Sequence, residues 1–162
     1  MSHSNIALIT GASGGIGMEL ARIHAATGND LVIIARSEGK LLALKSELMN
    51  KHKVNVWVIT EDLSSPDSAK RIYQQTEQLG IKISTLINNA GFGGHGLFHQ
   101  RELVQDQAMM QVNMVTLTNL THLYLQDMVK ANFGRILNVS STASFMPGPL
   151  QAVYYATKAY VT

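Results

Sequence analysis

The residues best suited to chemistry in this chain are a tyrosine and a lysine in the stretch Tyr154-Tyr155-Ala156-Thr157-Lys158. Tyr154 and Lys158 are four residues apart, so in a helix their side chains share one face. A tyrosine without neighbours has a pKa of about 10 and is a poor base near neutral pH, but a close ammonium favours its phenolate. The pair therefore predicts a site of proton transfer. Tyr155 is only three residues from Lys158, and we expect it to pack.

A second region suited to chemistry lies near the N-terminus, where a glycine-rich turn separates an expected strand from an expected helix. It reads Thr10-Gly11-Ala12-Ser13-Gly14-Gly15-Ile16-Gly17. Glycine lets the backbone turn tightly and approach a phosphate, and the following helix directs free N–H groups and the positive end of its dipole at that phosphate. This context predicts that residues 10–17 bind the pyrophosphate of a dinucleotide. A purely structural turn is the alternative for the glycines alone.

The elements that must position these two regions alternate between short apolar runs and longer segments of helical period. This alternation predicts an α/β fold, a doubly wound parallel sheet, in a single domain that spans residues 1–162. Strands are expected at residues 6–9, 31–35, 54–60, 85–88 and 135–139. Helices are expected after the glycine turn to about residue 27, at about 40–52, from a cap at Ser65 to Gly80, at about 101–131, and from about 151 onward.

The longest expected helix, residues 101–131, carries an apolar stripe at alternating four- and three-residue spacing. The stripe comprises Met110, Met114, Leu117, Thr121, Tyr124 and Met128. Such a stripe usually packs against a sheet, which is the interpretation we favour, and contact with a partner helix is the alternative. Leu120 and Leu123 lie off the stripe, so we expect part of this helix to contact a second subunit.

The glycine turn resembles the cofactor turn of the short-chain dehydrogenase/reductase family, because its form is TGxxxGxG rather than GxGxxG. Further matches follow in the family's order. They are Asn88-Asn89-Ala90-Gly91 after a strand, Asn113 in the long helix, Ser141 thirteen residues before Tyr154, and Lys158. The resemblance implies a Rossmann-type sheet with strands in the order 3-2-1-4-5 and with the family's strands 6 and 7 missing.

The resemblance also implies catalytic roles for Asn113, Ser141, Tyr154 and Lys158. A hydride would move between a nicotinamide and a carbonyl or secondary alcohol, with Tyr154 as general acid or base. Lys158 would also reach the nicotinamide ribose hydroxyls. Ser141, which we choose over Ser140, would hydrogen-bond the substrate oxygen and stabilise charge that develops there. Asn113 would position water for a proton relay toward Lys158.

The cofactor can be inferred from the end of the second strand. Many NAD enzymes place an acid there, whereas this chain has Ala35 followed by Arg36. A guanidinium pairs bidentately with phosphate, so we expect Arg36 to bind a 2′-phosphate and NADP(H) to be preferred over NAD(H). An ordinary surface arginine is the alternative. The resemblance adds Asp62 and Leu63 at the adenine, and Asn89, Ala90 and Gly91 along the cofactor cleft.

Composition narrows the classes of function further. The chain is 46% hydrophobic and 15% charged, which argues against disorder. Its net charge of +2 comes from scattered basic residues, so we expect no nucleic-acid partner. The absence of cysteine excludes disulfides and thiolate metal sites and fits a cytoplasmic protein. We expect neither a signal peptide nor a membrane segment, and no metal at His95 and His99, which lack a third ligand nearby.

The length of the chain leaves two hypotheses. Family members commonly run to about 250 residues, so the resemblance implies that roughly a third of such a protein is absent. The chain is then either the catalytic part of an NADP-dependent oxidoreductase or an inactive cofactor-binding or partner-binding fragment of one. We favour the oxidoreductase because the catalytic residues are intact, and we expect a homo-oligomer formed through residues 101–131 and the helix that starts near residue 151.

Overall fold

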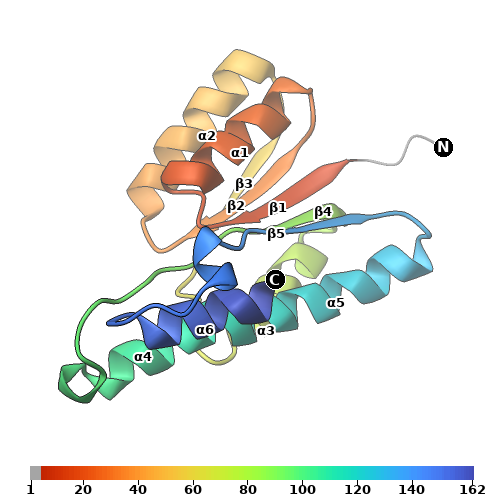
Figure 1. The fold of residues 1–162 in the computed structure, drawn as a ribbon. Coiled ribbons are helices and arrows are strands. Elements are labelled where there is room, and N and C mark those ends of the chain that lie inside the picture. The colour runs from red at the N-terminus through yellow and green to blue at the C-terminus, as the bar shows by residue number, and fades with distance from the viewer. Residues whose placement is uncertain (1–4) are drawn as a thin grey trace.

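A parallel sheet of five strands runs through the centre of the molecule, whose computed structural model describes residues 5–162 (Figure 1). The strands are β1 (Ile6–Thr10), β2 (Leu31–Ala35), β3 (Val56–Thr60), β4 (Ile83–Asn88) and β5 (Arg135–Asn138). Their order is β3-β2-β1-β4-β5, and each neighbouring pair is parallel. This confirms the predicted α/β fold and strand order. The carboxyl ends of all five strands therefore meet at one edge of the sheet.

Helices cover both faces of this sheet. On one face lie α1 (Gly15–Ala26) and α2 (Glu38–His52), and on the other lie α3 (Ser68–Gln78), α4 (Leu103–Met110), α5 (Leu117–Lys130) and α6 (Ala152–Val161) (Figure 1). Every residue of β1 and β2 is buried between these layers, as expected of parallel strands. Side chains alternate between two cores: Ala7 and Ile9 pack with α1 and α2, whereas Ile6 and Leu8 pack with α3 and α5.

The element ends lie within about two residues of the predicted ones, but the residue that caps α3 differs. The cap predicted at Ser65 is wrong, because α3 begins at Ser68 with Asp67 as its N-cap. Ser65 instead forms part of a turn: its carbonyl accepts a hydrogen bond from the Ser68 N–H, and its hydroxyl accepts one from Arg71. The serine is therefore used to hold the loop rather than to start the helix.

The segment predicted as one helix over residues 101–131 is helical from α4 to α5 but changes its period in the middle. A π-helical segment, Gln111–Thr116, separates the two helices. Because a π turn contains more residues than an α turn, the buried positions before it are shifted. The predicted core stripe is therefore right at its C-terminal end, where Tyr124 is buried, and wrong at its start, where Met110 is 37% exposed and Met109 is buried instead.

The outer surface of this long helical stretch also differs from expectation. Leu120 is only 1% exposed and belongs to the core beneath α5, and Leu123 packs against the same core. Leu120 is therefore not available to a second subunit. The large apolar side chains that this stretch does expose are Leu103, Val104 and Met110 of α4, together with Val115, Leu125 and Val129.

Candidate functional site

An open cleft of about 490 Å³ lies along the carboxyl ends of the strands, a size in the range of cofactor sites. Most residues that the sequence singled out line this cleft. They are Gly11, Ser13, Ile16, Arg36, Asp62, Leu63, Asn89, Ala90, Gly91, Tyr154 and Lys158. The other predicted residues, which belong to the neighbouring segments but not to the lining, are Thr10, Gly15, Gly17, Asn113 and Ser141.

The glycine turn between β1 and α1 presents bare backbone to the cleft. Gly11 has a φ of +70°, which favours glycine, and a Cβ built there would lie 2.9 Å from Ala90 Cα. Gly14, the N-cap of α1, has no side-chain cap, and a Cβ built there would meet nothing within 4 Å. The first N–H groups of α1 therefore combine open space, no capping side chain and the positive end of the helix dipole. These features fit the pyrophosphate of a dinucleotide.

Gly17 shows why this turn also needs a glycine inside the helix. A Cβ at Gly17 would overlap Gly11 O and Asn89 Nδ2. Asn89 Nδ2 donates to Thr10 O at 3.0 Å, while the Thr10 hydroxyl accepts from the backbone N–H groups of Asn89 and Ala90, both at 3.0 Å. Hydrogen bonds and close packing on the side away from the cleft thus join the turn, α1 and the segment after β4. Thr10 and Gly17 shape the cleft in this way without lining it.

The end of the cleft beyond β2 and β3 carries opposite charges. Arg36 follows the last residue of β2, and Asp62 lies in the loop after β3. Asp62 Oδ1 accepts hydrogen bonds from the Ser64 N–H at 3.0 Å and from the Ser64 hydroxyl at 2.8 Å. These bonds, the backbone one first, and the charge of Arg36 lower the pKa of Asp62, so that it is ionised near neutral pH. The guanidinium of Arg36 and the carboxylate of Asp62 are thus available to an adenosine whose ribose carries a phosphate.

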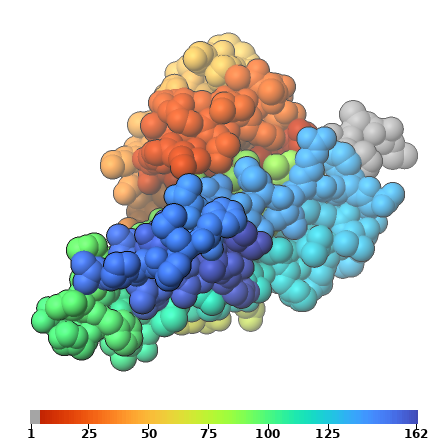
Figure 2. Space-filling view, viewed as in Figure 1, coloured from red at the N-terminus to blue at the C-terminus, as the bar shows by residue number. Residues whose placement is uncertain are grey.

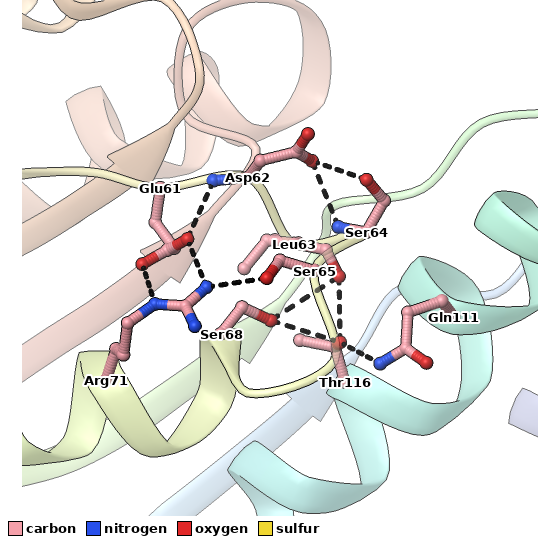
Figure 3. Close-up of polar contacts among 9 residues, drawn as sticks. All are labelled: Glu61, Asp62, Leu63, Ser64, Ser65, Ser68, Arg71, Gln111 and Thr116. Atoms are coloured by element: carbon pink, nitrogen blue, oxygen red, sulfur yellow. Dashed lines mark hydrogen bonds and ion pairs between the residues drawn. The ribbon is translucent and has the colours of Figure 1, made fainter.

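The loop after β3 is tied to two helices (Figure 3). The Glu61 carboxylate accepts hydrogen bonds from Arg71 of α3 at 3.0 and 2.8 Å, and from the Asp62 N–H at 3.1 Å. At the end of the π-helical segment, the Thr116 hydroxyl donates to Leu63 O at 2.8 Å. The residues predicted to meet the adenine are therefore anchored from α3 on one side and from the π-helical segment on the other.

Tyr154 and Lys158 lie on α6, and both line the cleft. Lys158 is 6% exposed, and its Nζ donates to Val139 O at 2.9 Å. Burial lowers the pKa of Lys158 below its ordinary value. A Cβ built at Gly93 would lie 3.3 Å from the ring of Tyr154, so the loop after β4 passes directly against the tyrosine. Figure 2 shows the green part of this loop, before α4, beside the blue residues that lead into α6.

Asn113 is fully buried in the π-helical segment and joins the parts of the reacting end. Its Oδ1 accepts from the Phe92 N–H at 3.1 Å, and its Nδ2 donates to Phe92 O and Thr157 Oγ1, both at 3.0 Å. A Cβ built at Gly91 would lie 3.0 Å from Asn113 Oδ1 and 3.4 Å from Lys158 Nζ. The structure thus brings Asn113 and Lys158 close to the same lining residue, Gly91, and the water-positioning role of Asn113 stays a prediction.

The two serines after β5 make different contacts. Ser140 lines the cleft, and its hydroxyl donates to Lys158 O at 3.0 Å and shares a 2.7 Å hydrogen bond with the Thr162 hydroxyl. The Ser141 hydroxyl accepts from the Ala143 N–H at 3.1 Å, at the start of a short 3₁₀ turn. Ser140 therefore ties β5 to α6, and the choice of Ser141 for the substrate oxygen stays a prediction.

Several residues of the cleft were not identified from the sequence. Glu61 and Val139 directly follow β3 and β5, and the strand-end rule that singled out Arg36 would have found both. Val112 also lines the cleft. It comes from the π-helical segment, and no signal in the sequence marked the change of helical period there.

Within residues 5–162, no group of three or more His, Cys, Asp or Glu residues is arranged to hold a metal ion. Over the same residues, none of the helices has both the length and the hydrophobicity that crossing a bilayer requires.

The fold, the glycine turn and the tyrosine–lysine pair define a Rossmann-type dinucleotide-binding domain, and comparison with known proteins gives its family. The family model described as short chain dehydrogenase matches residues 5–162. The very-long-chain 3-oxoacyl-CoA reductase of Homo sapiens is 34% identical over 163 residues, covering 96% of this chain and 50% of that protein. The 3-oxoacyl-acyl-carrier-protein reductase FabG of Aquifex aeolicus is 30% identical, covering 97% and 63%. This chain belongs to the short-chain dehydrogenase family.

Solved structures give the same result. A short-chain dehydrogenase from Sphingobium yanoikuyae in complex with NADPH has a TM-score of 0.91 and 34% identity, covering 97% of this chain and 61% of its own. The bulky-bulky ketone specific alcohol dehydrogenase from Comamonas testosteroni has a TM-score of 0.92 and 32% identity, covering 99% and 64%. The chain spans about half the length of the human relative and under two thirds of the other three.

Proposed function

We propose that this chain supplies the cofactor cleft and the proton-transferring residues of an oxidoreductase that moves hydride between NADP(H) and a carbonyl or secondary alcohol. The observation that carries the proposal is that Tyr154 and Lys158 line the same cleft as the glycine turn and Arg36. An extended dinucleotide would fit this row of strand ends, because it offers an anion-binding helix end, a cationic side chain and a tyrosine. Membership of the short-chain dehydrogenase family supports the reaction class.

The choice of NADP(H) rests on the residues at the end of β2. Arg36 would pair with the 2′-phosphate, and Ala35 offers no carboxylate to the ribose hydroxyls. The backbone N–H groups at the start of α1 would hold the pyrophosphate. The solved relative from Sphingobium yanoikuyae was determined with NADPH, which supports the same choice.

The reacting end of the cleft suits acid–base chemistry. When bound, the nicotinamide supplies the hydride to the carbonyl carbon or takes it from the alcohol carbon. In reduction Tyr154 would give its phenolic proton to the substrate oxygen, and in oxidation its phenolate would take the proton back. Lys158 has three N–H groups and uses one on Val139 O, so two are available for a ribose hydroxyl and for stabilising the phenolate. Ser141 would hydrogen-bond the substrate oxygen.

The test of this proposal is the replacement of Tyr154 by phenylalanine, with Tyr155→Phe as a matched control. Tyr155 packs its ring over Gly148 and does not line the cleft. Oxidation of NADPH is followed with a panel of ketones and 3-oxoacyl thioesters, the latter suggested by the names of the reductases above. Tyr154→Phe should lower kcat by about 10²- to 10⁴-fold without weakening NADPH binding, while Tyr155→Phe retains activity. Equal activities of Tyr154→Phe and the wild-type chain would contradict the proposal.

We also propose that the chain forms a homo-oligomer through the long helical stretch and α6. The exposed apolar side chains Val115, Leu125, Val129 and Tyr160 support this, because they lie on these elements. Sedimentation should give more than one copy per particle, and Val129→Glu should shift the equilibrium toward the monomer. A wild-type chain that sediments as a monomer at all concentrations would contradict this proposal.

A further inference from the structure

A carboxylate stands beside the position where Arg36 would hold a 2′-phosphate. Glu61 directly follows β3, and its N–H donates to Ala35 O at 3.1 Å, so it lies next to the last residue of β2. Neighbouring strands are about 4.8 Å apart, and Glu61 lines the cleft together with Arg36 and Ser37. An unpaired carboxylate at this distance would weaken the binding of a phosphate by charge repulsion.

The Glu61 carboxylate is paired with the guanidinium of Arg71 (Figure 3). Arg71 of α3 contacts both carboxylate oxygens, at 3.0 and 2.8 Å. The Glu61 side chain is 12% exposed and that of Arg71 is 41% exposed, so the carboxylate is the less solvated partner and depends on the arginine for neutralisation. Arg71 itself does not belong to the lining of the cleft and reaches it only through Glu61.

The three charged side chains that line this end of the cleft balance only when Arg71 is added to them. Arg36 and Arg71 are positive, whereas Glu61 and Asp62 are negative. Without Arg71, the two carboxylates would outweigh Arg36, and the site would carry a net negative charge. Such a site would repel a 2′-phosphate strongly and a ribose hydroxyl hardly at all.

We propose that Arg71 determines cofactor specificity by neutralising Glu61, which allows this cleft to prefer a cofactor with a 2′-phosphate. The inference rests on the proposed function, in which the cleft binds NADP(H). Arg71 acts as a positioning and charge-balancing residue rather than a catalytic one. The 2′-phosphate is the group by which NADPH differs from NADH, so the effect of Arg71 falls on NADPH and spares NADH.

The same ion pair could instead act only by shaping the loop, and this alternative has a different signature. Glu61 accepts the Asp62 N–H, and Arg71 also donates to Ser65 Oγ at 2.8 Å. A purely structural role would affect both cofactors, because both carry the adenosine that this loop would contact. It would also make loss of either partner harmful, whereas charge balance gives the two partners opposite effects.

The experiment is a titration of the wild-type chain, Arg71→Met, Glu61→Gln and the double variant with NADPH and with NADH at one low ionic strength. Arg71→Met should reduce the NADPH-over-NADH preference about tenfold or more. Glu61→Gln keeps an oxygen for the Asp62 N–H and removes the charge, so the preference should stay the same or rise. The double variant should return to near the wild-type preference. The same comparison is repeated without the nicotinamide, by measuring the affinity for adenosine 2′,5′-bisphosphate relative to that for adenosine 5′-monophosphate.

The matched control is Arg22→Met, which removes a second bidentate arginine–glutamate pair. Arg22 contacts both oxygens of Glu47 at 2.8 Å, on the α1 and α2 face and outside the cleft lining. It should leave the preference unchanged.

Three results bear directly on the inference. An unchanged preference in Arg71→Met would overturn it while the proposed function stands. A lowered preference for NADPH in Glu61→Gln would also overturn it. If Arg71→Met fails to fold, the result for Glu61→Gln is sufficient to test the inference. A wild-type chain with no preference for NADPH would instead contradict the cofactor choice in the proposed function, and this inference with it.

Discussion

The two ends of the cleft are built on different parts of the sheet. The phosphate and adenosine end rests on β1 and β2, which are buried throughout. Hydrogen bonds of Thr10, Glu61 and Thr116 join its loops to the neighbouring elements. The reacting end rests on β5, where all residues but one are exposed, and on α6. There, the links between elements include Lys158 to Val139 O and Asn113 to Thr157. The cofactor end is therefore part of the core, whereas the reacting end is attached to it by a few buried polar contacts.

Cofactor binding and proton transfer therefore depend on different layers of the structure. Substitutions at the phosphate turn should disturb the core and the cleft together, because the same backbone forms both. Substitutions at the reacting end should act through individual hydrogen bonds and one buried charge. Substitutions in the two regions should therefore differ in what they disturb.

Gly17→Ala should have the largest effect on stability. Its Cβ would overlap Gly11 O, which is backbone and cannot move aside cheaply. We expect a loss of about 3 kcal/mol in the free energy of unfolding, a drop of roughly 6–12 °C in Tm, and loss of NADPH binding. Gly14→Ala is the control, because Gly14 has an extended φ of 176° and open space around it. Equal Tm values for the two variants would show that the turn is not packed as described.

Asn113→Ala should be the most damaging single change at the reacting end. It removes three hydrogen bonds, two to the backbone of Phe92 and one to the hydroxyl of the buried Thr157. The expected cost is about 2–3 kcal/mol, measured by urea unfolding. NADPH affinity should change little, because Asn113 does not line the cleft. Asn119→Ala, at an exposed position of α5, is the control and should be close to neutral. A cost as small as that of the control would contradict the linking role.

Thr116→Val tests the tie between the π-helical segment and the adenosine loop. The change keeps the volume of the side chain and removes the donor to Leu63 O. We expect a loss of about 1 kcal/mol, together with weaker binding of both NADPH and NADH. Thr118→Val is the control, since its 2.7 Å hydrogen bond to Tyr160 is exposed and should contribute under about 0.5 kcal/mol. Undiminished binding of both cofactors would show that the loop does not need this tie.

Lys158 should give the smallest effect, a dependence of stability on pH. Burial lowers its folded-state pKa, so the unfolded chain holds more protons between that pKa and the ordinary value of 10.5. The penalty is full below the folded pKa and is relieved as the pH rises toward 10.5. The stability of the wild-type chain relative to Lys158→Met should therefore rise with pH in this window, measured by urea unfolding at several alkaline pH values. A relative stability that falls with pH would contradict the burial of the charge.

The fold was largely predictable from the sequence because its signals are local. Continuous apolar strands and the glycine turn identified β1, β2 and α1, and strand ends at one edge placed Arg36 and Asn89 in the cleft. The spacing of Tyr154 and Lys158 likewise placed both on one face of α6. These signals depend on neighbours in the sequence or on the common direction of parallel strands.

What the sequence did not predict are features that no periodic pattern marks. The π-helical segment shifted the start of the core stripe, so that Met110 is partly exposed, and Leu120, which was placed off the stripe, is buried. Ser65 forms a turn bonded to Arg71 rather than a helix cap. The pairing of Glu61 with Arg71 likewise joins a strand end to a helix ten residues away, and no periodic pattern marks it.

The most direct test of the account is a fluorescence titration of this chain with NADPH and with NADH, repeated for Arg36→Ala. We predict tighter binding of NADPH, and a selective loss of that advantage in Arg36→Ala while NADH binding persists. Failure of the chain to bind either cofactor would contradict the assignment of the cleft. Equal binding of both, unaffected by Arg36, would contradict the choice of NADP(H).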